Sequence, residues 1–281
     1  MSLTVQDLLE AGTHFGHQTK RWNPKMKRFI LCPKNGIYII DLNKTLLSLD
    51  KFLDRVRSEV SRGGKVLFVG TKKQLKDSIR EEAERCNMPY VTERWLGGML
   101  TNFQTIRQSI AKLEKIEKME ADGTIEALPK KERMLLAKRK EKLISVLSGI
   151  RNVKKLPSII FVVDTIKEHI AISEGRKLHI PIGGVVDTNC DPDVVDFPIP
   201  GNDDAIKSVQ LIARAVSDTI LSVNETVTTA EEMEAAKEES VSDAESVDVS
   251  VDEEVVDVEE EGTAKKRKVV RKKVVKYSED E

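Results

Sequence analysis

The sequence predicts an α/β fold with a parallel sheet flanked by helices, and two observations support this prediction. Short, almost continuous apolar runs are typical of strands buried on both faces, and they occupy residues 37–40, 66–69, 159–163 and 185–186. Amphipathic helical patterns alternate with them, at 72–86 and 203–223. Because strand and helix alternate, we expect a three-layer sandwich of sheet and helices over residues 1–225.

A helical hairpin is predicted to interrupt this domain at 103–150. Apolar residues recur there at steps of three and four in a first series, Phe103, Ile106, Ile110, Leu113 and Ile116, and a second series runs through Leu136, Leu143, Leu147 and Ile150. Charged residues flank both narrow seams, which is typical of an antiparallel coiled coil that projects from a domain. The alternative, in which both helices lie on the sheet, stays open from periodicity alone.

From residue 226 to 281 the sequence is low in complexity and is predicted to be a disordered tail. Residues 230–281 contain 18 acidic and nine basic side chains, with the acidic block first, so the rest of the chain carries a net charge of +8. Such a composition buries too little apolar surface to offset the entropy of ordering. The basic cluster at 265–273 could contact RNA or the acidic block, but a solvated tail is the simpler interpretation.

Cysteine usage and the absence of long apolar segments favour a cytoplasmic protein. Cys32, Cys86 and Cys190 show no CxxC spacing, so neither a disulfide framework nor a thiolate metal site is indicated. No apolar run reaches the roughly 18 residues of a membrane span, and no basic region with a long apolar run follows Met1. We therefore expect no membrane partner.

A nucleotide-dependent α/β enzyme is the first functional class to consider, because ligands of such folds bind beyond the carboxyl ends of the strands. The segment 70–74 and the glycine pairs at 97–98 and 183–184 lack the spacing of phosphate-binding loops. Asp164 and Asp187 end predicted strands, but helix caps and turns explain such residues equally well. The sequence predicts no catalytic residue, no required cofactor and no small-molecule substrate, and a stand-alone enzyme is kept as the alternative.

A structural divalent cation is a second hypothesis. His14 and His17 are three residues apart, and several aspartates follow the later strands. Histidine with carboxylates suits zinc, whereas oxygen ligands alone suit magnesium. The candidate ligands are His17, Asp187, Asp203 and Asp204, and the alternative is that the histidines form ordinary hydrogen bonds or face RNA.

The most informative stretch is 13–29, which contains five cations, two histidines and three aromatic residues. No acidic residue occurs from Ala11 to Ile40, whereas a merely solvated surface normally mixes both charges. Cations neutralise phosphates, amides reach sugars or bases, and an aromatic ring offers a stacking face. The predicted RNA-binding residues are Lys20, Arg21, Trp22, Asn23, Lys25, Lys27 and Arg28, although Trp22 could instead anchor the loop. Cations near the hairpin extend the set by Arg94, Arg107, Lys138 and Arg139.

Four long motifs in order resemble the bacterial small-subunit ribosomal protein S2 family. They are Leu8–His17, Trp22–Met26, Glu93–Phe103 and Pro181–Asn189, and the resemblance covers nearly all of residues 1–225. It implies a structural constituent of the cytoplasmic ribosome that supports translation, with an α/β domain and an inserted coiled-coil hairpin at the junction of head and body. It further implies contacts with ribosomal RNA and neighbouring proteins, and recruitment of the large multi-OB-fold small-subunit protein. The tail departs from the family pattern.

Overall fold

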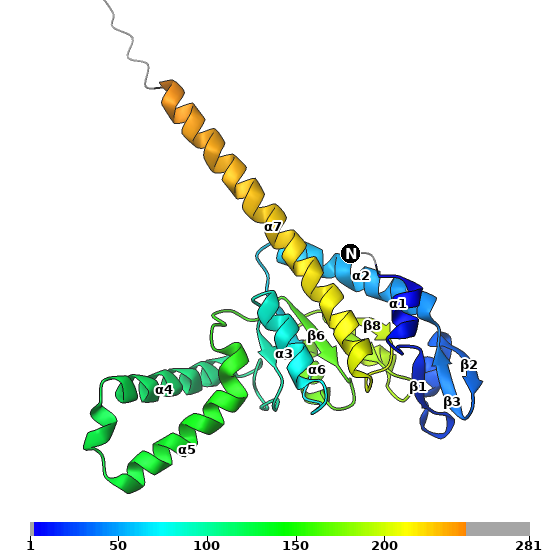
Figure 1. Cartoon of the computed structure of the whole chain (residues 1–281), viewed down its shortest axis with the longest axis horizontal. Helices are drawn as coiled ribbons and strands as arrows, with labels where there is room; N and C mark the ends of the chain where they lie inside the picture. Colours follow the sequence, from blue (N-terminus) through cyan, green and yellow to red (C-terminus); the bar gives the residue numbers. More distant parts are fainter. Residues whose placement is uncertain (1–2, 246–281) are drawn as a thin grey trace, which may run out of the picture. The chain divides into compact units, whose positions relative to one another are not determined.

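A computed structural model describes residues 3–245 of the chain, and a five-stranded parallel sheet forms its centre (Figure 1). The strand order is β5-β4-β6-β7-β8, and all neighbours run parallel. The strands are β4 (Val66–Val69), β5 (Tyr90–Val91), β6 (Ile159–Val163), β7 (Ile182–Val186) and β8 (Phe197–Pro200). The chain divides into two compact units, Met1–Glu234 and Ala235–Glu281, and the sheet belongs to the first.

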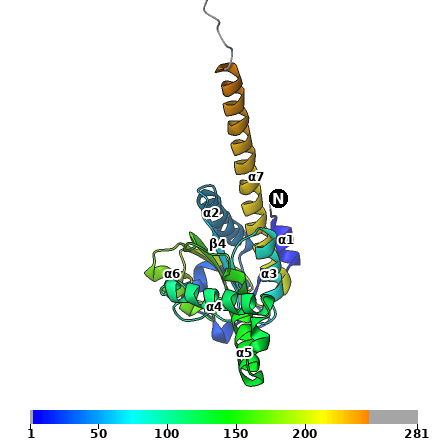
Figure 2. The same ribbon diagram turned by 90° about the vertical axis from the view of Figure 1, so that its left-hand side faces the viewer.

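Helices cover both faces of this sheet, which confirms the predicted α/β class. One face packs against α2 (Leu42–Val60), α3 (Lys76–Arg85) and the first part of α7 (Ile206–Glu245). The other face packs against α6 (His169–Lys177) and the segment that leads into the hairpin. Figure 2 shows α6 on the opposite side of the sheet from α3 and α7. Each central strand is therefore buried on both faces, which explains its continuous apolar run.

The glycine pair in β7 serves packing. A Cβ at Gly183 would lie 2.1 Å from Cε2 of Phe52, a side chain of α2. The Phe52 ring stacks on Phe161 of β6, with 5.8 Å between the ring centroids. Glycine at 183 thus lets α2 approach the sheet.

Residues 37–40 form a strand as predicted, but the prediction that this strand belongs to the parallel sheet is wrong. β3 (Ile37–Ile40) lies in the middle of a separate antiparallel sheet, between β1 (Phe15–Gln18) and β2 (Ile30–Lys34). Asn35 and Gly36 join β2 to β3 with φ values of 50° and 78°, as a two-residue hairpin turn requires. The Asn-Gly pair is a local signal for this hairpin that the apolar run alone does not carry.

Two paired helices, α4 (Phe103–Ala121) and α5 (Lys130–Leu147), occupy most of the segment 103–150. Ile106 and Ile110 belong to a core that includes the sheet, whereas Leu113 and Ile116 are buried on α4 outside both cores. The outer half of the pair therefore packs on itself, and Figure 1 shows both helices extending away from the sheet. Gly123, with φ of 69°, helps to turn the chain between them.

The remaining differences concern helix limits. α1 (Val5–Glu10) begins with a capping box made by Thr4 and Asp7, and α3 starts at Lys76 rather than at residue 72. α7 continues to Glu245, so residues 226–245 are helical where the sequence predicted a disordered tail. Ala and Glu, both good helix formers, dominate 230–239. The rest of the predicted tail, 246–281, lies outside the described residues. Among residues 3–245, none of the helices is both long and apolar enough to cross a membrane.

Candidate nucleic-acid interface

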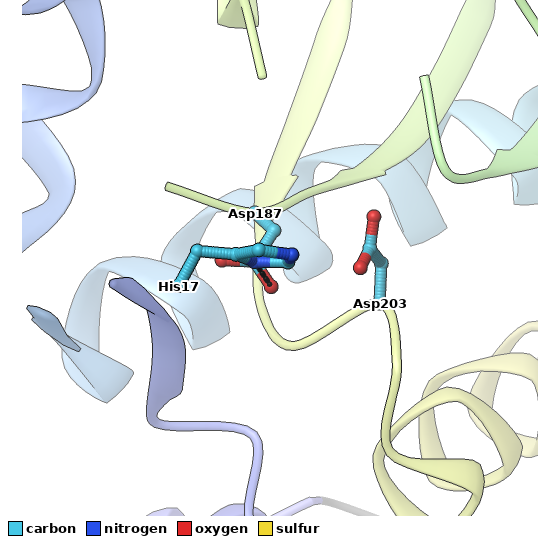
Figure 3. A group of neighbouring side chains, drawn as sticks. All are labelled: His17, Asp187 and Asp203. Atoms are coloured by element: carbon cyan, nitrogen blue, oxygen red, sulfur yellow. Dashed lines mark ion pairs between the residues drawn. The ribbon is translucent and has the colours of Figure 1, made fainter. Parts of the chain in front are cut away.

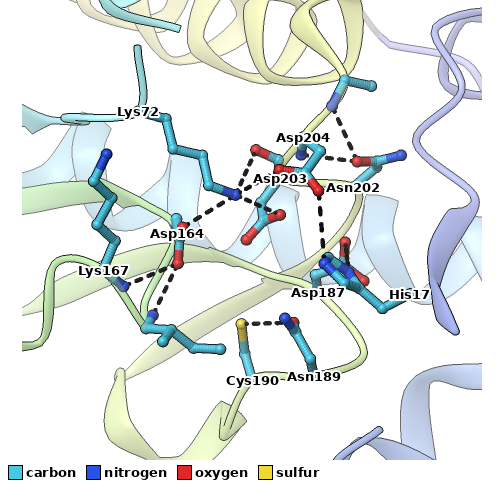
Figure 4. A network of polar contacts seen from close by, with 12 residues as sticks. His17, Lys72, Asp164, Lys167, Asp187, Asn189, Cys190, Asn202, Asp203 and Asp204 are labelled. Carbon is cyan, nitrogen blue, oxygen red and sulfur yellow. Dashed lines mark hydrogen bonds and ion pairs between the residues drawn. The ribbon is translucent and has the colours of Figure 1, made fainter. Parts of the chain in front are cut away.

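A polar cluster fills the space beyond the carboxyl ends of the parallel strands (Figure 4). His17 of β1 reaches Asp187, which directly follows β7, with 2.9 Å between Nδ1 and the carboxylate. The backbone N–H of His17 donates to Oγ1 of Thr188 at 2.8 Å. A Cβ at Gly16 would lie 2.5 Å from Thr188 Cγ2, so glycine at this position lets β1 approach the end of β7.

Lys72 is the main internal cation of this cluster. Its Nζ lies 3.0 Å from Asp164, 2.9 Å from Asp203 and 2.9 Å from Asp204. Burial alone would lower the pKa of Lys72, but the hydrogen bonds to Asp203 and Asp204 outweigh it and raise that pKa. Burial, with the nearby charge of Asp187, raises the pKa of Asp203 to about 6. Carboxylates thus hold the lysine in the crevice where α/β enzymes bind phosphates, and the excess negative charge disfavours a phosphate ligand.

Three of the four predicted metal ligands converge. One ligand atom each from His17, Asp187 and Asp203 lies within 4.8 Å of the others (Figure 3). The hydrogen bond that the His17 ring donates to the Asp187 carboxylate raises the pKa of His17. Asp204 is not part of this group, although its carboxylate lies 3.6 Å from Nε2 of His17. Both Asp203 and Asp204 also pair with Lys72.

A second group, Asp164, Cys190 and Asp203, was not found from the sequence because no local motif marks Cys190. Burial raises the pKa of the Cys190 thiol to about 12, so this thiol is a poor ligand. Lys72 already pairs with both aspartates of that group. His14 lies outside both groups, with its ring against Phe15 at 3.9 Å.

The predicted RNA-binding loop consists of two short 3-10 helices, η1 (Thr19–Arg21) and η2 (Pro24–Phe29). Buried Met26 anchors η2 to the core. The N–H of Asn23 donates to the carbonyl of Thr188 at 2.8 Å, and its side chain accepts from the N–H of Lys25. The structure therefore shows Asn23 acting as a helix cap, and the loop is held in one orientation.

The cations of this loop fall into two classes. Lys25 lies 2.7 Å from Asp191 and 3.1 Å from Asp193, and Arg28 lies 2.8 Å from Asp193. In contrast, the side chains of three exposed cations contact no partner among the described residues: Lys20, Arg21 and Lys27. Trp22 is half-buried, and its ring lies 5.2 Å from that of Tyr38, which favours the anchoring interpretation of this residue.

The four cations near the hairpin are exposed on three different elements. Arg94 follows β5, Arg107 lies on α4, and Lys138 and Arg139 lie on α5. None of the four pairs with an acidic side chain within the described part of the chain. The hairpin follows β5 at one edge of the parallel sheet, whereas His17 of β1 reaches the end of β7, so the two groups of cations form separate surfaces.

Glu174 of α6, which the sequence analysis missed, holds the entrance to the hairpin. One carboxylate oxygen accepts from Nε1 of Trp95 at 3.1 Å and from the N–H of Gly98 at 2.7 Å. The other accepts from the N–H groups of Leu100 and Thr101, both at 3.0 Å, and from the Thr101 hydroxyl at 3.1 Å. Burial alone would raise the pKa of Glu174, but these hydrogen bonds outweigh it and lower that pKa. A lone acid in an otherwise amphipathic helix was the only signal for this role.

Comparison with known proteins shows the family to which the chain belongs. A family model described as ribosomal protein S2 matches residues 8–223. The chain belongs to the ribosomal protein S2 family. A relative named small ribosomal subunit protein uS2, from Campylobacter concisus (strain 13826), is 61% identical over 218 residues, which are 78% of this chain and 83% of that protein. The protein of the same name from Campylobacter curvus (strain 525.92) is 56% identical over 241 residues, or 84% of this chain and 92% of its own length.

Membership of the S2 family confirms several predictions from the sequence. The chain is a bacterial small-subunit ribosomal protein, a structural constituent of the cytoplasmic ribosome that supports translation, and it is not an enzyme. The alternative of a stand-alone nucleotide-dependent enzyme is therefore wrong. In this chain the buried acidic cluster lies at the carboxyl ends of the parallel strands.

Proposed function

We propose that the chain binds ribosomal RNA at the head-body junction of the small subunit, through the loop at 20–28 and the hairpin cations. The observation that carries this proposal is the set of exposed cations without an internal acidic partner, presented on elements that are themselves firmly held. An unpaired cation on an ordered loop contacts a phosphate without first breaking an ion pair and without a large cost in ordering.

Within the loop, Lys20, Arg21 and Lys27 are the strongest candidates for phosphate contacts. Lys25 and Arg28 are held by Asp191 and Asp193, so they position the loop and contribute less to RNA binding. Asn23 is engaged as a cap, which leaves few groups for reading bases. The loop should therefore bind RNA by its backbone and shape rather than by its sequence.

The hairpin supplies a second contact as an inserted antiparallel coiled coil. Lys140 pairs with Glu120 across the two arms, and Arg151 pairs with Glu117 at the base, so the arms are tied together. Arg107, Lys138 and Arg139 stay free of such pairs within the described residues. Resemblance to the S2 family supports the remaining parts of the proposal, namely the place at the head-body junction and recruitment of the large multi-OB-fold protein.

A divalent cation at His17, Asp187 and Asp203 is a further part of the proposal. Four carboxylates meet in the cluster, and among the described residues only the side chains of Lys72 and His17 form ion pairs with them, so a cation would balance the charge. The histidine with two carboxylates suits zinc better than magnesium. The ion would tie β1, and hence the start of the loop, to the end of β7.

Sedimentation of cell extract tests the RNA-binding proposal. An epitope-tagged chain should travel with small subunits, and a K20A/R21A/K27A variant should shift toward the top of the gradient while keeping its circular dichroism spectrum. The matched control replaces Lys51, Lys177 and Lys207 by Ala, three exposed lysines without a side-chain partner among the described residues. If both triple variants sediment alike with subunits, the loop is not a contact.

Elemental analysis of the purified chain tests the cation site. We expect about one equivalent of zinc in the wild type and in C190S, and a loss of metal in H17A and D187N. Retention of metal in H17A, or its loss in C190S, would assign the ion to the other group. Absence of any divalent metal after purification without chelators would remove this part of the proposal.

A further inference from the structure

A cleft lies at the end of the parallel sheet opposite the acidic cluster. It encloses about 700 Å3 and is lined by the segments that precede β4, β5 and β6. These segments are Gly63–Lys65, Asn87–Pro89 and 152–156. The cleft therefore lies at the amino ends of the strands, away from the acidic cluster at their carboxyl ends.

The backbone segments that form the walls of this cleft approach one another closely. The N–H of Ser158 donates to the carbonyl of Lys65 at 2.9 Å and joins two of the three segments. A Cβ at Gly64 would lie 2.6 Å from the Glu59 carbonyl oxygen, and one at Gly149 would lie 2.2 Å from the Tyr90 carbonyl oxygen. The glycines thus permit a close approach that fixes the shape of the cleft.

The cleft presents three cations without an internal partner. Lys65, Lys154 and Lys155 line it, and no acidic side chain of residues 3–245 pairs with them. Glu84, the lining carboxylate, accepts a hydrogen bond from the hydroxyl of Tyr90 at 2.6 Å. Arg151, adjacent in sequence to the lining segment, is engaged by Glu117 and Glu114. The free charge of the cleft is therefore positive.

Backbone donors add to this charge. The N–H groups of four consecutive or nearly consecutive lining residues find no acceptor among the described residues, namely Asn152, Lys154, Lys155 and Leu156. Free backbone amides beside lysines are the usual ligands of phosphate oxygens. A protein partner would instead need apolar anchors. Among the described residues that line the cleft, Leu156 is the one large apolar side chain that is exposed, at 42%.

We propose that this cleft, formed by Lys65, Lys154, Lys155 and the backbone of 152–156, binds the sugar-phosphate backbone of ribosomal RNA. The inference rests on the proposed RNA-binding function and adds a third surface to the loop and the hairpin. Because all three lysines are free of ion pairs within residues 3–245, each contacts a phosphate at no cost of a broken ion pair, in contrast to Lys25 and Arg28. The base of the hairpin and the sheet would then be held against RNA together.

The test measures binding of the full-length chain to purified small-subunit ribosomal RNA across a series of salt concentrations. Each phosphate contact contributes roughly 0.7–0.9 to the slope of log affinity against log salt. The K65A/K154A/K155A variant should therefore lower the slope by about two to three, and K65R/K154R/K155R should restore it. The K51A/K177A/K207A variant, which removes the same charge elsewhere, is the control and should lower the slope by less than about one.

The outcomes separate this inference from the proposed function. If the wild type binds and the loop variant weakens binding, but the cleft variant behaves like the control, the inference is overturned and the proposed function stands. If the wild type itself shows no salt-dependent binding, both fail. If the cleft variant binds RNA normally but loses affinity for polyglutamate, used as an acidic peptide probe, the cleft serves a protein partner and the inference is likewise overturned.

Discussion

Glu174 offers the sharpest test of how the fold positions the hairpin. The E174Q substitution keeps the size of the side chain but leaves one acceptor oxygen in place of two. That oxygen can keep the larger set of donors, from Leu100 and Thr101. The new amide NH2 then faces two other donors, Nε1 of Trp95 and the N–H of Gly98, which lose their acceptor.

The expected cost follows from these two donors. A buried donor left without an acceptor costs about 1–3 kcal/mol, so E174Q should lower the free energy of unfolding by about 2–6 kcal/mol. Urea denaturation followed by circular dichroism and by tryptophan fluorescence measures this difference, and a W22F background leaves Trp95 as the one tryptophan, at the entrance to the hairpin. A change of this size is a large fraction of the roughly 5–15 kcal/mol typical of a domain.

The matched control is E168Q. Glu168 is also a buried acid next to α6, but a single oxygen accepts both hydrogen bonds, from the N–H and the hydroxyl of Thr71. The oxygen of glutamine can take both, so no donor is lost and the cost should stay below about 1 kcal/mol. Burial raises the pKa of Glu168, so its charged form is disfavoured in the folded state and the neutral amide fits there.

The two variants should also differ in their dependence on pH. The folded-state pKa of Glu174 is lowered, so its contribution to stability is present above the ordinary glutamate pKa and is lost as the pH falls through the folded value. The difference in the free energy of unfolding between wild type and E174Q should therefore become smaller at acidic pH. For Glu168 the folded-state pKa is raised, so protonation favours the folded state. The free energy of unfolding of the wild type should therefore rise relative to that of E168Q as the pH falls. Two results would refute this explanation: equal free energies of unfolding for E174Q and E168Q, or a difference between wild type and E174Q that does not change with pH.

Three other perturbations follow from particular contacts. G98V should destabilise the chain by about 1–3 kcal/mol in urea denaturation, because Gly98 has φ of 85°, whereas G97V should be nearly neutral because a Cβ at Gly97 meets nothing within 4 Å; equal effects would count against this distinction. G183A should cost about 1–3 kcal/mol by displacing Phe52, and a neutral result would show that α2 moves freely. Replacing Lys25 and Arg28 by Ala should lower the salt slope of RNA binding by less than about one, against about two to three for Lys20, Arg21 and Lys27, and the opposite order would mean that the ion pairs open on binding.

The sequence predicted the parts of the fold that depend on continuous or periodic burial. Ile159–Val163 is apolar at every position because both faces of β6 are covered, and α4 shows its seam because Ile106, Ile110, Leu113 and Ile116 share one side. The run at 37–40 was misassigned because burial on both faces says nothing about the partner strand. The Asn35-Gly36 turn carried that information, and the apolar pattern did not.

The sequence predicted which residue types occupy the candidate site, but it did not predict which side chains form ion pairs there. Five cations between residues 20 and 28 were evident, but the acids that pair with Lys25 and Arg28 lie more than 160 residues later in the chain. His17, Asp187, Asp203 and Asp204 were proposed together as metal ligands, and the fold brings ligand atoms of the first three within 4.8 Å of one another but leaves Asp204 outside that group. No sequence motif marks Glu174 or the lysines of the cleft, because their roles depend on backbone groups that only the folded chain brings together.

Photo-crosslinking within assembled small subunits tests the central claim most directly, because it reports RNA contacts of the chain in the particle. Peptides crosslinked to ribosomal RNA are identified by mass spectrometry. We predict crosslinks in residues 19–29 and in the hairpin helices α4 and α5, and none at the acidic cluster around Asp187 and Asp203. Crosslinks confined to that cluster, or an absence of any crosslink in residues 19–29 and 103–147, would contradict this prediction.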